Sequence, residues 1–67
     1  MGKLSSAKAD YWRKVALSAR AKADVSRMTS VAWSGEEHIA EGMRARAECE
    51  MAEADAADCV ADAYEEE

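Results

Sequence analysis

Small residues recur at every seventh position in both halves of this 67-residue chain, and this spacing constrains the fold more than any other feature. The first series is Ala9, Ala16, Ala23 and Ser30, and the second is Ala40, Ala47, Ala54 and Ala61. A seven-residue period keeps one kind of side chain on a single stripe of an α-helix, and small side chains let two helices approach closely. The two series therefore predict two helices that meet along an alanine-rich, close-packed seam.

Composition and capping signals indicate where these helices begin and end. The chain has no proline, and Ala, Glu, Arg, Lys and Met, which are strong helix formers, dominate it. The segment Ser34-Gly35-Glu36-Glu37 fits a capping box, in which Ser34 caps the second helix and Glu37 reaches back to it. We expect one domain over residues 1–67, with helices at about 7–30 and 35–63, a turn at about 31–35 and a frayed acidic tail at 64–67. Such a short turn predicts an all-α antiparallel hairpin.

Charge is divided unevenly between the two halves. Residues 1–33 carry seven Lys/Arg and two Asp, and residues 34–67 carry two Arg and twelve Asp/Glu, so the formal charges are +5 and −10. Arginine recurs every seven residues at positions 13, 20 and 27, which we call the basic stripe, and acidic residues recur at positions 41, 48, 55 and 62. The alanine register pairs Arg13 with Asp55, Arg20 with Glu48 and Arg27 with Glu41. Charge asymmetry of this kind bears on partners and self-association rather than on catalysis.

Larger apolar side chains follow the opposite flank of the predicted seam. They are Tyr11, Val15, Ile39, Met43 and Tyr64. A chain of this length buries only about 60% of its unfolded surface, so a partner chain commonly completes the core. We expect this apolar face to pair two hairpins into a homodimeric four-helix bundle.

The sequence offers no catalytic, cofactor or metal site. It has no Gly-rich phosphate loop and no nucleophile with a matching base, and it is too short to build a closed pocket, so it is not expected to be an enzyme. His38, Cys49 and Cys59 are zinc-capable residue types, but their spacing matches no structural zinc cluster. The acidic residues near the C-terminus lack the alternating ligands and the glycine of a calcium loop.

The cysteines and the hydropathy pattern point to a cellular compartment. On one helix Cys49 and Cys59 are separated by about 15 Å of rise, too far for a disulfide, so we expect reduced, buried thiols. No apolar run approaches the about 20 residues that a membrane span needs. These features predict a protein of the bacterial host cytoplasm.

We call residues 34–67 the acidic arm. It is the expected binding surface, through Glu48, Asp55, Asp58 and Asp62. Carboxylates along a rigid helix can imitate the charge row of a nucleic-acid backbone and occupy a basic groove on another protein. We therefore expect a small inhibitor from a phage or another mobile element, directed at a basic nucleic-acid-handling host protein such as a CRISPR effector.

Two other interpretations remain open from the sequence. The basic stripe of Arg13, Arg20 and Arg27 can bind the phosphates of RNA or DNA in a homodimeric hairpin. The same arginines can instead be internal counterions of the acidic arm. A third interpretation is a structural or assembly subunit with no such partner.

Overall fold

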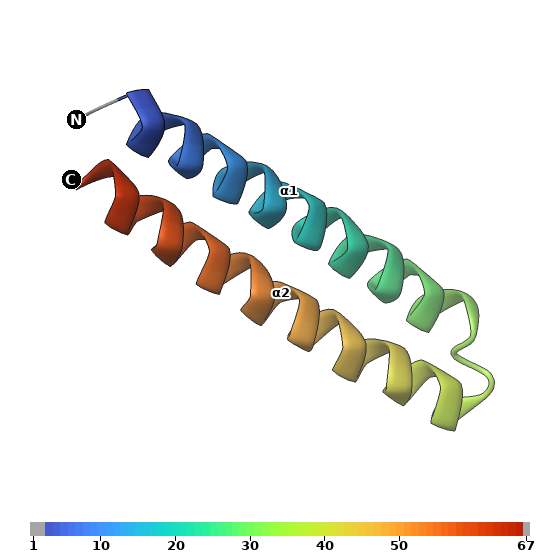
Figure 1. Cartoon of the computed structure of the whole chain (residues 1–67). Helices are drawn as coiled ribbons and strands as arrows, with labels where there is room; N and C mark the ends of the chain where they lie inside the picture. Colours follow the sequence, from blue (N-terminus) through green and yellow to red (C-terminus); the bar gives the residue numbers. More distant parts are fainter. Residues whose placement is uncertain (1–2, 67) are drawn as a thin grey trace.

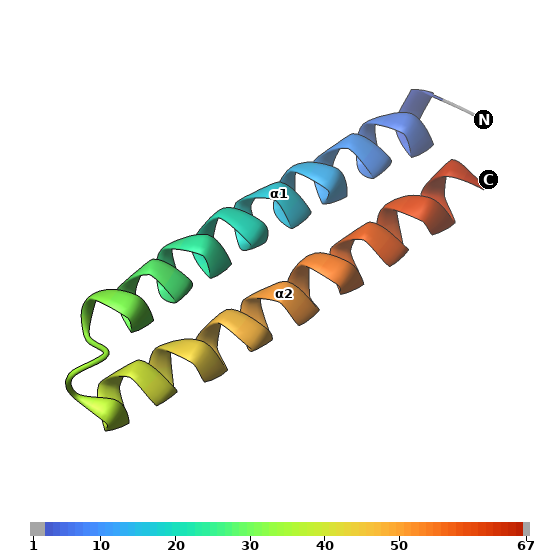
Figure 2. The same ribbon diagram turned by 180° about the vertical axis from the view of Figure 1, so that it is seen from behind.

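The computed structural model describes residues 3–66, which form two long α-helices joined by one turn (Figure 1). Helix α1 spans Lys3–Ala32 and helix α2 spans Glu37–Glu65. The helices run antiparallel and side by side along their whole length, and this arrangement is the same from behind (Figure 2). The start of α1 and the end of α2 lie together at the end opposite the turn. The predicted all-α helical hairpin is confirmed.

Both helices extend beyond the expected bounds, and the turn is confined to residues 33–36. Tyr64 and Glu65, which were expected in a frayed tail, belong to the last turn of α2. This turn is tied to α1 because Arg13 binds Glu65 at 2.9 Å and the Lys8 ammonium lies 5.4 Å from the Tyr64 ring centroid. Glu66 follows as the C-cap residue, and its backbone N–H donates to the Asp62 carbonyl at 3.1 Å. Glu67, the last residue of the expected tail, lies outside the described residues.

The start of α2 differs from the capping-box prediction. The N-cap residue is Glu36, in extended conformation, and its side chain makes no capping hydrogen bond. Ser34 instead belongs to the turn, where its backbone N–H donates to the Val31 carbonyl at 3.2 Å. The Glu36 N–H donates to the Trp33 carbonyl at 2.9 Å. Because α1 continues to Ala32, the chain turns later than expected and Ser34 lies too early to cap α2.

The predicted seam is confirmed, since every member of the two small-residue series is buried between the helices. At its centre Ala16 and Ala19 of α1 pack with Ala54 and Ala57 of α2, and Trp12 covers this cluster from one side. Among the described residues no large side chain is fully buried. Alanine therefore brings the helices close while burying little apolar area per residue.

The buried positions of each helix alternate in steps of three and four residues, as in a coiled coil. In α1 they include Ala16, Ala19, Ala23, Ser26 and Ser30, and in α2 Ala47, Glu50, Ala54, Ala57 and Ala61. This seam separates two broad sides of the hairpin. We call one the charged face, which contains Arg13, Arg20 and Arg27 with the facing acidic residues of α2. We call the other the apolar face, which contains Tyr11, Trp12, Val15, Val25, Ile39, Met43, Val60 and Tyr64.

Candidate functional site

A row of acidic side chains follows α2 along the charged face. Positions 37, 41, 44, 48, 51, 55, 58, 62 and 65 alternate in steps of four and three residues, which keeps them on one side of a helix. Only Arg44 and Met51 interrupt the carboxylates. We call the remaining seven the acidic row: Glu37, Glu41, Glu48, Asp55, Asp58, Asp62 and Glu65.

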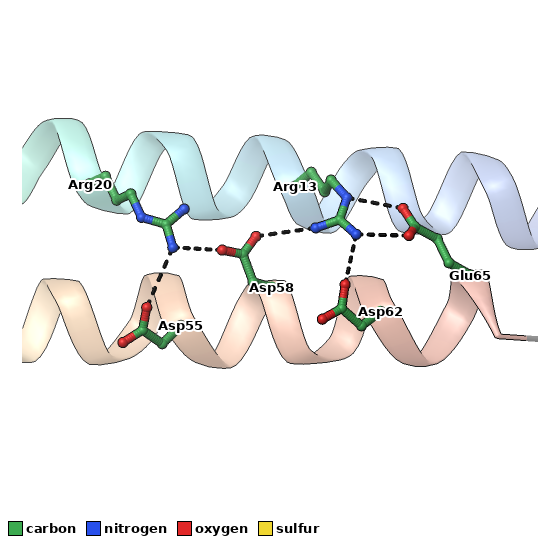
Figure 3. A network of polar contacts seen from close by, with 6 residues as sticks. All are labelled: Arg13, Arg20, Asp55, Asp58, Asp62 and Glu65. Atoms are coloured by element: carbon green, nitrogen blue, oxygen red, sulfur yellow. Dashed lines mark hydrogen bonds and ion pairs between the residues drawn. The ribbon is translucent and has the colours of Figure 1, made fainter.

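Arg13 binds the C-terminal end of the acidic row (Figure 3). Its Nη2 lies 2.8 Å from Asp62 Oδ1 and 2.9 Å from Glu65 Oε2, and its Nε donates to Glu65 Oε1 at 3.0 Å. Its Nη1 also lies 3.5 Å from Asp58 Oδ1. The hydrogen bonds that Arg13 donates to Glu65 and then to Asp62 raise the pKa of Arg13 above its ordinary value, so this guanidinium stays charged.

Arg20 continues the same network about two turns along α1. Its Nη2 donates to Asp58 Oδ2 at 2.6 Å and to Asp55 Oδ1 at 3.4 Å. The hydrogen bond that Arg20 donates to Asp58 is the main cause that raises the pKa of Arg20. Asp58 lies between the two arginines and contacts both, so Figure 3 shows one continuous chain of contacts rather than separate pairs. Two arginines thus neutralise part of the charge of four carboxylates.

The partners of these arginines differ from the predicted register. Arg13 contacts Asp58, Asp62 and Glu65 instead of Asp55. Arg20 contacts Asp55 and Asp58 instead of Glu48. Helical side chains lean toward the N-terminus of their own helix. In an antiparallel pair this lean carries a side chain of α1 toward the C-terminal end of α2, whereas the prediction compared backbone levels only.

Arg27 forms no contact with Glu41, its predicted partner. Its closest acidic contact is Asp24 of the same helix, at 3.7 Å. Moving the Arg13 pattern two heptads along places Arg27 opposite positions 44, 48 and 51, and two of these are Arg44 and Met51. The row therefore offers Arg27 only one carboxylate where Arg13 finds three.

The N-terminal half of the acidic row is consequently open. Within residues 3–66, Glu37, Glu41 and Glu48 form no ion pair, and all are exposed. Of the four carboxylates predicted to bind a partner, only Glu48 belongs to this open half, because the others contact Arg13 or Arg20. Sequence reasoning did not single out Glu37 and Glu41 as binding residues. The alternating step of three and four residues was the signal that could have joined them to Glu48.

Exposed apolar side chains lie at the same end of the hairpin as these open carboxylates. Met28 is 71% exposed and Val31 is 73% exposed, on the last turns of α1. With Arg27 and Ala32 they line a shallow hollow of about 410 Å³. The open carboxylates and these exposed apolar side chains therefore both lie in the half of the hairpin that contains the turn.

The predicted assembly residues occupy the apolar face in different ways. Tyr11 is 61% exposed and makes an edge-to-face contact with Trp12, with ring centroids 5.3 Å apart. Val15 is half-buried and packs against the central alanine cluster. The other three predicted members, Ile39, Met43 and Tyr64, are half-buried on α2.

Cys49 and Cys59 are free thiols, and both are exposed rather than buried as expected, because their positions on α2 point away from the seam. No group of three or more His, Cys, Asp or Glu side chains within residues 3–66 is arranged to hold a metal ion. Over the same residues, neither helix combines the length and the apolar character needed to cross a membrane.

No protein-family model, curated protein or solved structure matches this chain. The surface of the hairpin, rather than a relative, is therefore what points to a function.

Proposed function

We propose that this chain is a non-enzymatic binding protein whose charged face docks on a basic surface of a nucleic-acid-handling protein. The observation that carries this proposal is the division of the acidic row. Its C-terminal half is occupied by Arg13 and Arg20, whereas Glu37, Glu41 and Glu48 have no ion-pair partner among the described residues. Exposed carboxylates without internal counterions are available to an external cation.

The linear arrangement of the open carboxylates supports a partner that normally binds phosphates. Glu37 and Glu41 are about 6 Å apart along the helix axis, and Glu48 lies about 10 Å further on, beyond Arg44. A nucleic-acid strand carries its phosphates at about 3.4 Å of axial rise. The open carboxylates therefore share the charge sign and the linear order of phosphates rather than their spacing, and they can bind lysines and arginines of a basic groove. An inhibitor that occupies such a groove would need no catalytic residue.

The apolar side chains near the turn support a protein partner over a purely ionic one. Charge complementarity mainly accelerates encounter and rejects wrong partners. Affinity is concentrated in a few well-packed anchors that become fully desolvated. Met28 and Val31 are exposed at the same end as the open carboxylates and can provide such anchors.

The test is a pull-down from a nuclease-treated bacterial lysate with the whole chain as bait. A protein retained by the wild type should be released by added duplex DNA and by raised salt, and the variant Glu41→Lys/Glu48→Lys should lose it. Asp10→Lys is the matched control, because Asp10 is exposed and unpaired among the described residues but lies at the far end of α1. Circular dichroism must show that each variant remains helical.

Two results would contradict the proposal. In one, the Glu41→Lys/Glu48→Lys variant retains the captured protein as well as the wild type does. In the other, the wild type retains RNA or DNA when nuclease is omitted, and Arg27→Gln abolishes this retention. The second result would favour nucleic-acid binding through the basic stripe.

A further inference from the structure

We infer that the apolar face binds a second copy of the same chain, so that two hairpins form an antiparallel four-helix assembly. Two observations locate the surface. Tyr11 is 61% exposed and Val25 is 62% exposed on α1, both on this face. Beside them, Val60 of α2 is also exposed, whereas the seam, within residues 3–66, contains no large side chain that is fully buried. Large apolar side chains of this face thus remain exposed to solvent in the single hairpin.

The apolar face also contains two grooves. One groove of about 300 Å³ runs from Trp12 and Val15 of α1 to Ala56 and Val60 of α2. A second, of about 520 Å³, runs from Val25 of α1 to Met43 and Arg46 of α2. Both grooves are lined by residues of the apolar face, so they open on the same side of the hairpin. Protruding side chains next to hollows are what a self-complementary surface requires.

The charges on this face favour a second copy over a partner of one charge sign. The face carries two cations, Lys22 and Arg46, and two carboxylates, Glu50 and Glu53, around the grooves. Among the described residues, Lys22, Arg46 and Glu53 form no ion pair. A nearly neutral, mixed surface suits a copy of itself, whereas the charged face would repel its own copy.

Two-fold symmetry brings the complementary groups together. In an isologous interface, if one residue contacts another across the axis, the reverse contact also forms. Tyr11 and Val25 are spaced equally on either side of Ser18, near the middle of α1. A two-fold axis that crosses the face at Ser18, perpendicular to the helices, therefore places Tyr11 opposite Val25 of the second copy.

The apolar face is also large enough to form a standard dimer interface. The hairpin measures 52 × 12 × 9 Å between Cα atoms. Its broad side therefore covers about 600 Å² before side chains widen it, near the roughly 800 Å² per partner of a standard interface. The acidic row lies on the other side of the seam, so this dimer leaves both charged faces exposed. The inference therefore stands independently of the proposed function.

Sedimentation equilibrium of the full chain tests this inference. At micromolar concentration the wild type should have twice the 7.3 kDa mass of one chain. Val25→Glu should weaken the dimer about tenfold or more, because it places a charge in the apolar contact with Tyr11 of the second copy. Val31→Glu, the same change at an exposed valine of α1 outside the apolar face, should leave the mass unchanged.

Tyr11→Glu gives a second, independent variant, because Tyr11 is exposed and its replacement leaves the seam intact; it should dissociate the dimer while helicity is retained. A wild type with the mass of one chain throughout the micromolar range would overturn the inference. So would a dimer that survives both Val25→Glu and Tyr11→Glu.

Discussion

The buried pair of Ser26 and Glu50 is the polar exception within an alanine seam. Glu50 is only 7% exposed, and its Oε1 accepts a hydrogen bond from Ser26 Oγ at 2.6 Å. A buried carboxylate is costly unless it is hydrogen-bonded. Any slip of one helix along the other would separate this carboxylate from its donor. The pair therefore favours one register in a seam whose alanines alone would tolerate several.

Ser26→Ala should lower the free energy of unfolding by about 1–3 kcal/mol, because it leaves a buried acceptor without its donor. The double variant Ser26→Ala/Glu50→Leu should recover most of this loss, since removing both polar partners from a buried site is often close to neutral. Urea denaturation followed by circular dichroism measures both effects. Ser18→Ala, at an exposed position of the same helix, is the control. Equal stability of Ser26→Ala and Ser18→Ala would show that the pair does not stabilise the hairpin.

At the scale of the helix, α2 begins without the usual side-chain cap. Glu36 has the extended backbone of an N-cap residue, φ −118° and ψ 90°, but its side chain does not bond to the first turn. Ser, Asp and Asn are the residues that cap well, because their short side chains reach the free N–H groups. Glu37 still places a negative charge in the first turn, where the helix dipole favours it. The start of α2 is therefore only partly stabilised.

Glu36→Ser should stabilise the hairpin by about 0.5–2 kcal/mol, because it supplies the missing cap. Ser34→Ala should leave the free energy of unfolding unchanged, whereas the capping-box pattern predicts that it lowers this free energy. Thermal unfolding at matched protein concentration compares the two variants with the wild type. A large loss in Ser34→Ala would mean that the helix starts at Ser34 in solution.

The seven-residue spacing of small residues was sufficient to predict the two helices and the buried seam, and the short turn was sufficient to predict their antiparallel order. It was not sufficient to predict ion-pair partners, because the lean of Arg13 and Arg20 along the helix is a side-chain property. The turn was misplaced for a related reason. A capping pattern shows where a helix can start, whereas the residue at which α1 stops depends on packing with α2. Glu37 and Glu41 form no ion pair because the observed offset places Arg27 opposite positions 44, 48 and 51 instead. Predicting this also required the three-dimensional register.

Across the whole molecule, opposite charges are concentrated on the two helices and meet at the end away from the turn. Arg13 and Arg20 link α1 to four carboxylates of α2, whereas the ion pair that Arg27 forms among the described residues is with Asp24 of its own helix. Exposed ion pairs are individually weak, but a shared network also relieves repulsion among the neighbouring carboxylates. Ion pairs thus link the two helices at the end away from the turn, whereas the end near the turn has unpaired carboxylates.

Arg13→Gln should lower the thermal midpoint of unfolding more than Arg27→Gln at low ionic strength. The reason is that Arg13→Gln leaves Asp58, Asp62 and Glu65 without their shared counterion. The difference between the two variants should shrink in 1 M salt, where charges are screened over about 3 Å. Thermal scans at low and high salt give this comparison. Equal midpoints of the two variants at low salt would contradict a stabilising role for the network.

The elongated shape of the single hairpin has a hydrodynamic consequence. The radius of gyration is 15.3 Å, whereas a compact domain of this length has about 11 Å. A single hairpin therefore experiences the drag of a rod and elutes from a sizing column ahead of a compact protein of equal mass. Pairing through the apolar face would thicken this rod without lengthening it. Association would then double the mass while making the particle less asymmetric, so its frictional ratio should fall.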